Sequence, residues 1–120
     1  MAFVEGFVVP VPKRKLAVYR RMAKTAGKVW RKYGATAYVE CVAASKMDKG
    51  KRTSFPRAVK LKPSETVVFS WIVYKTKADR DRVFPKVMKD PKLKNMMDPK
   101  KMPFDAKRML WGGFRVMVDP

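Results

Sequence analysis

The sequence predicts an α+β fold in which strands and helices follow one another as β-α-β-β-α-β within one domain, residues 1–120. Four short runs rich in β-branched and aromatic residues indicate strands. Two longer segments between them carry apolar residues three and four positions apart, the spacing of an amphipathic helix. A chain of 120 residues has room for one hydrophobic core but not for two.

The N-terminal part of the chain predicts a strand followed by a helix. The run FVEGFVV at 3–9 is apolar, and we expect Pro10 and Pro12 to end the strand there. Residues 13–33 have apolar side chains at helical spacing, and Gly34 follows as a helix stop.

The middle of the chain predicts two strands separated by less regular structure. TAYVECVA at 36–43 is the second strand, and a polar turn follows at 45–52. We expect 53–61 to be extended and interrupted at Pro56. TVVFSWIVY at 66–74 is the strongest strand signal in the chain.

The C-terminal part predicts a second helix and a last strand. Thr76, with an acid three residues later, is typical of a helix N-cap and predicts a helix over 77–89. Pro85 lies inside this helix and is expected to kink or restart it. One helical turn is expected near 92–97, and the last strand spans 108–118, where two glycines indicate a bulge or a close backbone approach.

This order of elements is the ferredoxin-like arrangement, an antiparallel sheet with two helices on one face. The other face would be left open to solvent, which is unfavourable for large apolar side chains. We expect that face to carry Phe7, Tyr38, Trp71 or Ile72, and Trp111. A second copy of the chain would cover it, so the predicted assembly is a homodimeric α+β barrel.

The composition excludes several classes of chemistry. The chain has one cysteine and no histidine, so an intramolecular disulfide, a Cys/His zinc site and a histidine-based catalytic pair are excluded. We expect no metal and no cofactor, and an enzyme only if carboxylates, Tyr, Lys or Arg carry the reaction. No apolar run is long enough to span a membrane, and no basic segment precedes the first apolar run. We therefore expect no membrane insertion and a cytoplasmic location.

Several motifs are distributed along nearly the whole chain: VEGFVVPVPKRKLAVYRRMA, YVEC, SFPRAVK, VVFSWIVY, DPKL and MPFDAKRMLWGGF. Together they resemble the YbaA-like bacterial family of domains of unknown function. The resemblance implies a dimeric ferredoxin-like α+β barrel and carries over no catalytic residues. Ala106 replaces an expected glycine, and Arg115 stands where an acid often follows GGF. Members of the family are usually neutral or acidic.

The net charge of +19 departs from that pattern and is far above the magnitude of about 2–8 that suits a small domain. No acid lies between Glu5 and Glu40, a span that holds nine basic residues. Either a polyanionic partner selected this charge, or a stable scaffold was supercharged by engineering or strong adaptation. In both cases we expect polyanions to bind the first helix, through Arg20, Lys24, Lys28, Arg31 and Lys32.

Alternation along the strands suggests which polar residues line the barrel interior. Glu5, Tyr38, Glu40, Trp111 and Arg115 are the candidate lining residues. We expect Glu5 and Arg115 to form a structural ion pair, and Glu40 to be either a structural carboxylate or a general base. Cys41 would face the opposite side, toward the helices.

The stretch NMMDPKKMPFD at 95–105 combines adaptable methionines with turn-forming prolines. We expect Met96, Met97, Met102 and Phe104 to close the barrel or the dimer seam, with a ligand lid as the alternative.

The predicted function is therefore a homodimeric scaffold that binds nucleic acid, other polyanions or an oppositely charged protein through charge alone. The first alternative is a small-molecule binding protein or cofactor-independent enzyme that uses the barrel interior. The second is a specific RNA-binding protein, although the third strand lacks the glycine and the basic residue of an RNA-recognition motif.

Overall fold

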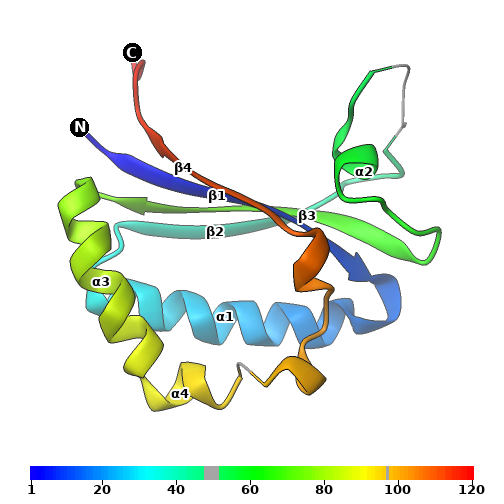
Figure 1. Ribbon diagram of the computed structural model, residues 1–120, viewed down its shortest axis with the longest axis horizontal. Helices are drawn as coiled ribbons and strands as arrows, with labels where there is room; N and C mark the ends of the chain where they lie inside the picture. Colours follow the sequence, from blue (N-terminus) through cyan, green and yellow to red (C-terminus); the bar gives the residue numbers. More distant parts are fainter. Residues whose placement is uncertain (48–51, 97) are drawn as a thin grey trace.

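The computed structural model describes residues 1–47, 52–96 and 98–120, and its strands form one antiparallel sheet in the order β2-β3-β1-β4 (Figure 1). Helices α1 and α3 follow the first and third strands, which confirms the ferredoxin-like α+β fold. The strands are β1 (Phe3–Pro12), β2 (Ala37–Val42), β3 (Glu65–Tyr74) and β4 (Leu110–Arg115). The helices are α1 (Leu16–Tyr33), α2 (Phe55–Ala58), α3 (Lys77–Lys89) and α4 (Pro91–Lys94), with 3-10 turns at Lys13–Lys15, Pro99–Lys101 and Ala106–Arg108.

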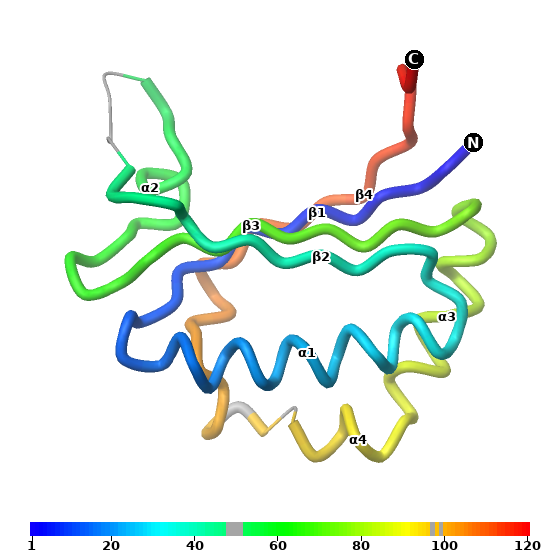
Figure 2. Tube along the Cα trace, turned by 180° about the vertical axis from the view of Figure 1, so that it is seen from behind, coloured from blue at the N-terminus to red at the C-terminus, as the bar shows by residue number. Residues whose placement is uncertain are grey.

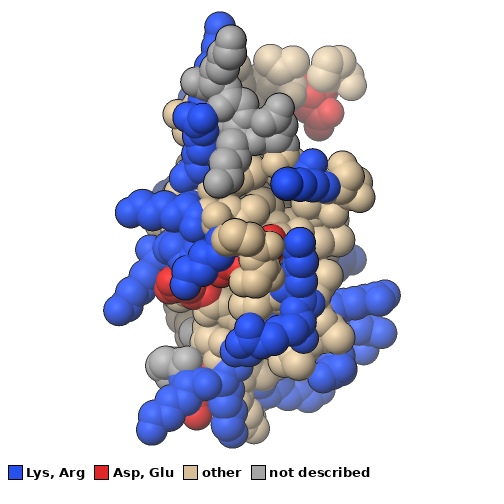
Figure 3. All heavy atoms as spheres, turned by 90° about the vertical axis from the view of Figure 1, so that its right-hand side faces the viewer, with Lys and Arg blue, Asp and Glu red and all other residues tan. Residues whose placement is uncertain are grey.

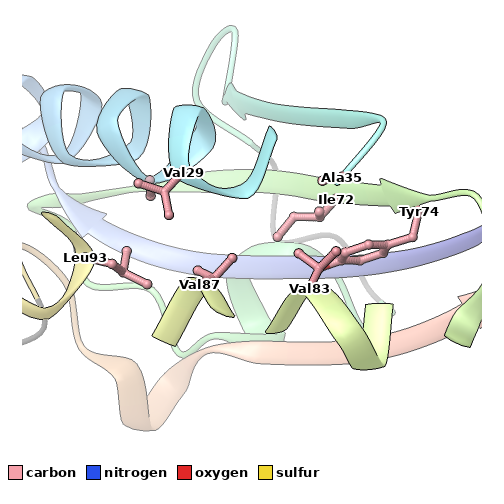
Figure 4. Close-up of a cluster of buried hydrophobic side chains, with 8 residues drawn as sticks. Val29, Ala35, Ile72, Tyr74, Val83, Val87 and Leu93 are labelled. Carbon is pink, nitrogen blue, oxygen red and sulfur yellow. The ribbon is translucent and has the colours of Figure 1, made fainter. Parts of the chain in front are cut away.

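The molecule has two layers. Helices α1, α3 and α4 all lie on one face of the sheet, and the two chain ends lie beside each other at one end of it (Figures 1 and 2). The main core fills the space between these layers, where Val83 and Val87 of α3 point toward Ile72 and Tyr74 of β3 (Figure 4). Val29 of α1 completes this part of the core.

Local sequence signals place both long helices where they were predicted. Gly34 ends α1 with a φ of +128°, a backbone conformation that side chains disfavour. The Thr76 side chain accepts a hydrogen bond from the backbone N–H of Asp79 at 3.1 Å and so caps α3. Helix α3 continues through Pro85 as a single element.

Strand β1 is longer than predicted, because its prolines do not end it. Pro10 and Pro12 pair with β3, opposite Val67 and Glu65, whereas β4 pairs with β1 only as far as Val8. Beyond Val8 one edge of β1 has no neighbouring strand, so a missing proline N–H breaks no ladder on that side.

Two further expectations about local structure can be compared with the described residues. The segment 53–61 is not simply extended: Ser54 caps the short helix α2, and Pro56 lies in its first turn, where a missing N–H is tolerated. The β1–β4 register is unbroken across Gly112 and Gly113, so these glycines form no bulge. Residues 48–51 of the expected polar turn lie outside the described residues.

The predicted assignment to the side of the sheet away from the helices is wrong for Phe7, Tyr38 and Trp111 and right for Trp71, the alternative given there to Ile72. Phe7 lies opposite Trp111, and Tyr38 lies opposite Ile72, which is 3% exposed in the core under the helices. These residues therefore face the helices, and Trp71 faces the other way. Alternation divides a strand into two sets, but both sets are apolar here, so the pattern does not identify the set that contacts the helices.

The side of the sheet away from α1 and α3, which we call the open face, is only partly covered. Val59, next to α2, packs against Val8 and Val67 at one end of it. Cys41 belongs to this side and is exposed, so its predicted position toward the helices is wrong. Within the described residues, no helix is both long and apolar enough to cross a membrane.

Candidate functional site

A cavity of about 440 Å³, the inner cavity, lies between the sheet and the helical layer. All four strands and helices α1, α3 and α4 contribute to it, together with the segment before β4. Its volume falls in the range of about 300–1,000 Å³ found for small-molecule pockets. Its walls are mainly apolar, and its residues are Glu5, Phe7, Val9, Tyr19, Met22, Ala23, Ala26, Trp30, Tyr38, Glu40, Ser70, Ile72, Arg80, Phe84, Met88, Leu93, Met96, Met102, Phe104, Met109 and Trp111.

Glu5, only 3% exposed, is held by three donors from three different elements. Its carboxylate accepts hydrogen bonds from the Tyr74 hydroxyl at 2.8 Å, Trp111 Nε1 at 3.0 Å and Arg80 Nη2 at 3.2 Å. The expected pair with Arg115 does not form, because Arg115 lies opposite Phe3 at the exposed end of β4. Arg80, which projects from α3, supplies the compensating charge that a buried carboxylate requires.

The Glu5 network continues through Tyr74 to the first helix. Trp30 Nε1 donates to the Tyr74 hydroxyl at 2.9 Å, and that hydroxyl donates to Glu5. Burial and the hydrogen bond to Glu5 raise the pKa of Tyr74 above its usual value, so the phenol stays protonated as a donor.

Glu40 is the second carboxylate of the inner cavity, and only phenols hold it. Its Oε2 accepts from the Tyr38 hydroxyl at 2.6 Å, and its Oε1 accepts from the Tyr19 hydroxyl. Burial, followed by the charge of Glu40, raises the pKa of both tyrosines well above the usual range. Within the described part of the chain, no Lys or Arg forms an ion pair with Glu40.

Gly27 of α1 makes this arrangement of Glu40 possible. A Cβ atom at position 27 would lie 2.7 Å from Cδ1 of Tyr38, so the Tyr38 ring uses the space that a side chain would occupy. The ring also packs against Trp30 with a centroid distance of 5.9 Å. The glycine thus lets β2 present Tyr38 and Glu40 directly to the helix.

The chemistry available in the cavity follows from these partners. Each oxygen of Glu40 accepts one hydrogen bond within the protein and keeps a further lone pair for a ligand donor. The same carboxylate is able to take a proton from a bound acid, while Tyr19 and Tyr38 remain protonated donors. The described residues include no cluster of three His, Cys, Asp or Glu side chains that would hold a metal ion.

The methionine-rich stretch near the C-terminus forms part of the cavity wall. Met96, Met102 and Phe104 line the inner cavity, and Phe104 packs edge-to-face on Tyr19 at 5.7 Å. Thioether side chains adapt to irregular space and to different ligands. Met97 lies outside the described residues.

The predicted polyanion-binding residues separate into two groups. Arg20, Lys24, Lys28 and Arg31 line a groove of about 820 Å³ between α1 and β2, which we call the basic groove. Lys32 instead contacts Asp90 at 3.6 Å. Lys and Arg side chains also dominate the face shown in Figure 3, where acids are few.

Sequence reasoning missed several residues of the inner cavity. Glu5, Tyr38, Glu40 and Trp111 were predicted to line an interior, and they do line one, but under the helices and not between two sheets. Tyr19 and Trp30 lie within residues 13–33, which the sequence predicts only as a helix, and Tyr74 and Arg80 are not among the predicted lining residues. The signal available for them was indirect: a carboxylate inside an apolar strand needs donors from elsewhere in the chain.

Comparison with known proteins gives relatives along the whole chain. The profile of a family described as "Protein of unknown function (DUF1428)" matches residues 2–106. The chain is 46% identical over 119 residues to "Uncharacterized protein YbaA" of Escherichia coli strain K12, and equally to that of Shigella flexneri, with 99% of each chain covered.

Two solved structures are similar in fold. An uncharacterized NIPSNAP domain protein from Burkholderia xenovorans superimposes with a TM-score of 0.61 and 12% identity over 97% of this chain and 95% of its own. Rv0793 from Mycobacterium tuberculosis gives a TM-score of 0.57 and 10% identity over 99% and 98%. At these identities the similarity supports the fold alone.

Proposed function

Since the chain belongs to the DUF1428 family, whose function is unknown, we propose its function from the site: the inner cavity binds a small, mainly apolar molecule that carries a hydrogen-bond donor. Family membership confirms the resemblance found in the sequence, and it supplies no activity. The proposal rests on one observation: a carboxylate in the wall of a largely apolar cavity is held by two phenols and by no Lys or Arg among the described residues.

The polar groups of the cavity explain why the ligand should be a donor. Arg80, Trp111 and Tyr74 already donate to Glu5, and Tyr19 and Tyr38 already donate to Glu40. The remaining capacity is therefore mainly for accepting hydrogen bonds. A hydroxyl or amine group on the ligand would satisfy it, and an anionic group would be repelled. If the ligand also loses a proton to Glu40, the protein is a cofactor-independent enzyme.

The test is an NMR-detected screen of neutral apolar compounds with one hydroxyl or amine group, each paired with an analogue methylated at that group. Ala26→Leu fills the cavity, because Ala26 is buried in α1 and lines it. Ala17→Leu on the exposed side of α1 is the matched control. Glu40→Gln removes the charged acceptor.

We expect donors to bind at least about tenfold more tightly than their methylated analogues, a difference of about 1.4 kcal/mol. Ala26→Leu and Glu40→Gln should weaken this binding, and Ala17→Leu should leave it unchanged. An affinity that is unchanged in both Ala26→Leu and Glu40→Gln, or no binding by any compound, would overturn the proposal.

The second candidate function is electrostatic binding of polyanions by the cationic surface. Its specific support is that Arg20, Lys24 and Lys28 are exposed and have no ion-pair partner among the described residues. A labelled RNA hairpin, single-stranded DNA and polyphosphate should all bind, with similar and steep loss of affinity as salt rises. One RNA that stays bound at high salt while the others dissociate would contradict charge-only binding.

We propose two possible origins for the high positive charge. Supercharging by engineering or strong adaptation agrees with a core that keeps the family motifs, and selection by a polyanionic partner agrees with the same surface.

The exposed free thiol of Cys41 suits a reducing compartment, so the cytoplasm is the proposed location.

A second copy of the chain is the proposed partner for the open face. Of the 29 Lys and Arg residues, none occupies an open-face position in the four strands. Phe69, Trp71, Leu110 and Phe114 surround a hollow of about 580 Å³ there, and Phe114 is 62% exposed. An apolar sheet face whose strand positions carry no Lys or Arg disfavours RNA and suits contact with another apolar face.

Sedimentation equilibrium tests this dimer. The wild-type chain should be a dimer, and Phe114→Lys should shift it toward the monomer. Val18→Lys, which adds the same charge at an exposed position of α1, should leave the dimer intact. A wild-type monomer at all concentrations, or a Phe114→Lys variant that still dimerises fully, would refute the proposed interface.

A further inference from the structure

The basic groove lies beneath an unpaired edge of the sheet. Strand β2 is the outermost strand, with β3 as its only neighbour in the described part of the chain. Figure 2 shows β2 crossing the front of the sheet and α1 running alongside it, below, over its whole length. Tyr38, Glu40 and Val42 of β2 line the groove together with the cations of α1.

An unpaired strand edge presents backbone N–H and C=O groups at every second residue. Natural proteins protect such edges with charge, or use them to bind an extended peptide that adds one more strand. Side chains of an added strand would alternate between the two faces of the sheet. One set would therefore enter the groove beside Tyr38, Glu40 and Val42.

The cations of α1 repeat at the spacing that such a strand requires. Arg20, Lys24 and Lys28 are each four residues apart, which is a rise of about 6 Å along a helix. Side chains on one face of a strand repeat every two residues, or about 6.6–6.8 Å. Acidic side chains on the groove-facing side of an added strand would thus meet successive members of this row.

The charge of the groove selects the occupant. Four cations and one carboxylate line it, so an anionic segment is attracted into the groove and a cationic segment is repelled from it. Glu40 shares the face that the groove-directed side chains would occupy. Same-face neighbours on paired strands lie about 4.5–5.5 Å apart, so the residue opposite Glu40 should be uncharged.

We propose that β2 binds an extended acidic peptide as an additional strand, with two acids four residues apart directed at the α1 cations and an uncharged residue between them opposite Glu40. The proposal is independent of the inner-cavity ligand. It rests on the electrostatic attraction proposed above and adds a site, a register and a partner class to it.

The probe is a labelled peptide, Thr-Glu-Val-Thr-Val-Glu-Thr, measured by fluorescence anisotropy at physiological salt. Its control, Thr-Glu-Val-Thr-Glu-Val-Thr, has the same composition but directs its acids to opposite faces. Two further versions of the probe carry N-methyl groups on alternate sets of residues. Only one set of amides would face β2, so only one version should lose binding.

The protein variants isolate the groove from net charge. Arg20→Gln with Lys28→Gln removes the ends of the cation row. Lys86→Gln with Lys89→Gln makes the same charge change at exposed positions of α3 away from the groove. Amide hydrogen exchange of β2 with and without the peptide reports on the edge directly. Polyphosphate is measured in parallel.

We expect the probe to bind about tenfold more tightly than its control peptide. Its affinity should fall about tenfold in the groove variant, Arg20→Gln with Lys28→Gln, and should not fall in the α3 variant. The outward-facing amides of β2 should become protected from exchange. Equal binding of both peptides, or equal binding of both methylated versions, would overturn the strand-addition proposal, and retained polyphosphate binding would show that the electrostatic proposal survives. An oligothymidylate that outcompetes the peptide and weakens tenfold in the groove variant would assign the groove to single-stranded nucleic acid instead.

Discussion

Replacing Arg80 by methionine should destabilise the fold through Glu5, and a second substitution at Glu5 should reverse part of the loss. The side chain of Glu5 is 4% exposed and that of Arg80 is 21% exposed, so the Arg80 guanidinium is the compensating charge of a buried carboxylate. The Arg80 guanidinium also lies over the Phe84 ring, 4.5 Å from its centroid, and a methionine side chain would replace this contact by an apolar one. The charge is the main thing lost.

The expected magnitude follows from what remains around Glu5. Removing one partner of a fully buried ion pair costs about 3–5 kcal/mol. Tyr74 and Trp111 would still donate to the carboxylate, and the vacated side is close to solvent, so we expect a loss of about 2–3 kcal/mol of unfolding free energy. That is a large part of the about 5–15 kcal/mol typical of a domain.

Urea unfolding followed by far-UV circular dichroism measures these values. Arg82→Met is the control, because Arg82 is a neighbour on α3 whose side chain is 64% exposed, and its ion pair with Asp79 should contribute less than about 1 kcal/mol. In the Arg80→Met background, Glu5→Gln should restore about 1 kcal/mol, since a neutral amide needs no counter-charge. The argument fails if Arg80→Met costs no more than Arg82→Met, or if Glu5→Gln destabilises Arg80→Met further.

Three other predictions concern stability. The hydrogen bonds from Arg108 hold the pKa of Glu65 below its ordinary 4.5, so this pair stabilises the fold above that pH and the stabilisation is lost as the pH falls. Arg108→Met should therefore weaken the dependence of the urea midpoint on pH below about 4.5, and an unchanged dependence would contradict this. Gly27→Ala should lower the free energy of unfolding by about 1 kcal/mol or more, because the new Cβ atom displaces the Tyr38 ring. The same change usually stabilises a helix, so a rise in the free energy of unfolding would refute this packing. Raising the NaCl concentration from about 0.01 to 0.1 M shortens the Debye length from about 30 to about 10 Å and weakens the self-repulsion of a chain with a net charge of +19. The Tm should therefore rise over this range, and a fall in Tm would contradict surface repulsion.

The two proposed ligand surfaces differ in the chemistry that they select. The inner cavity offers carboxylate acceptors in an apolar space and favours a neutral donor. The basic groove offers cations beside an open strand edge and favours an acid. Tyr19, Ala23, Tyr38 and Glu40 line both, so these four residues form the wall between them. Glu40→Gln therefore changes both surfaces, whereas Ala26→Leu changes only the lining of the inner cavity and tests that cavity alone.

Local patterns identified most of the elements because their signals lie within short segments. The N-cap at Thr76, the stop at Gly34 and the β-branched run in β3 each act over a few residues, and the structure has the expected elements there. The predictions that Pro10 ends the first strand and that Pro56 interrupts an extended segment were wrong. Whether a proline ends a strand depends on which neighbour needs its N–H, and that neighbour comes from a distant part of the chain.

The candidate site shows the same division. Glu5 and Glu40 stood out in the sequence because a carboxylate within an apolar strand needs partners. Their partners were not predictable from spacing: Arg80 is 75 residues from Glu5 and Trp111 is 106 residues from it. Only the packing of α3 and β4 around β1 brings these three side chains together.

The order of the elements, the ferredoxin-like topology, the family and the high positive charge were all predictable from the residues, because each depends on local propensity, on motif identity or on a sum of charges. Which face of the sheet the helices cover became clear only in the folded chain. Both faces of these strands are apolar, so alternation alone leaves two equivalent choices, and only the packing of α1 and α3 distinguishes them. That choice places Glu5 and Glu40 in the inner cavity under the helices and leaves Phe69, Trp71 and Phe114 on the open face.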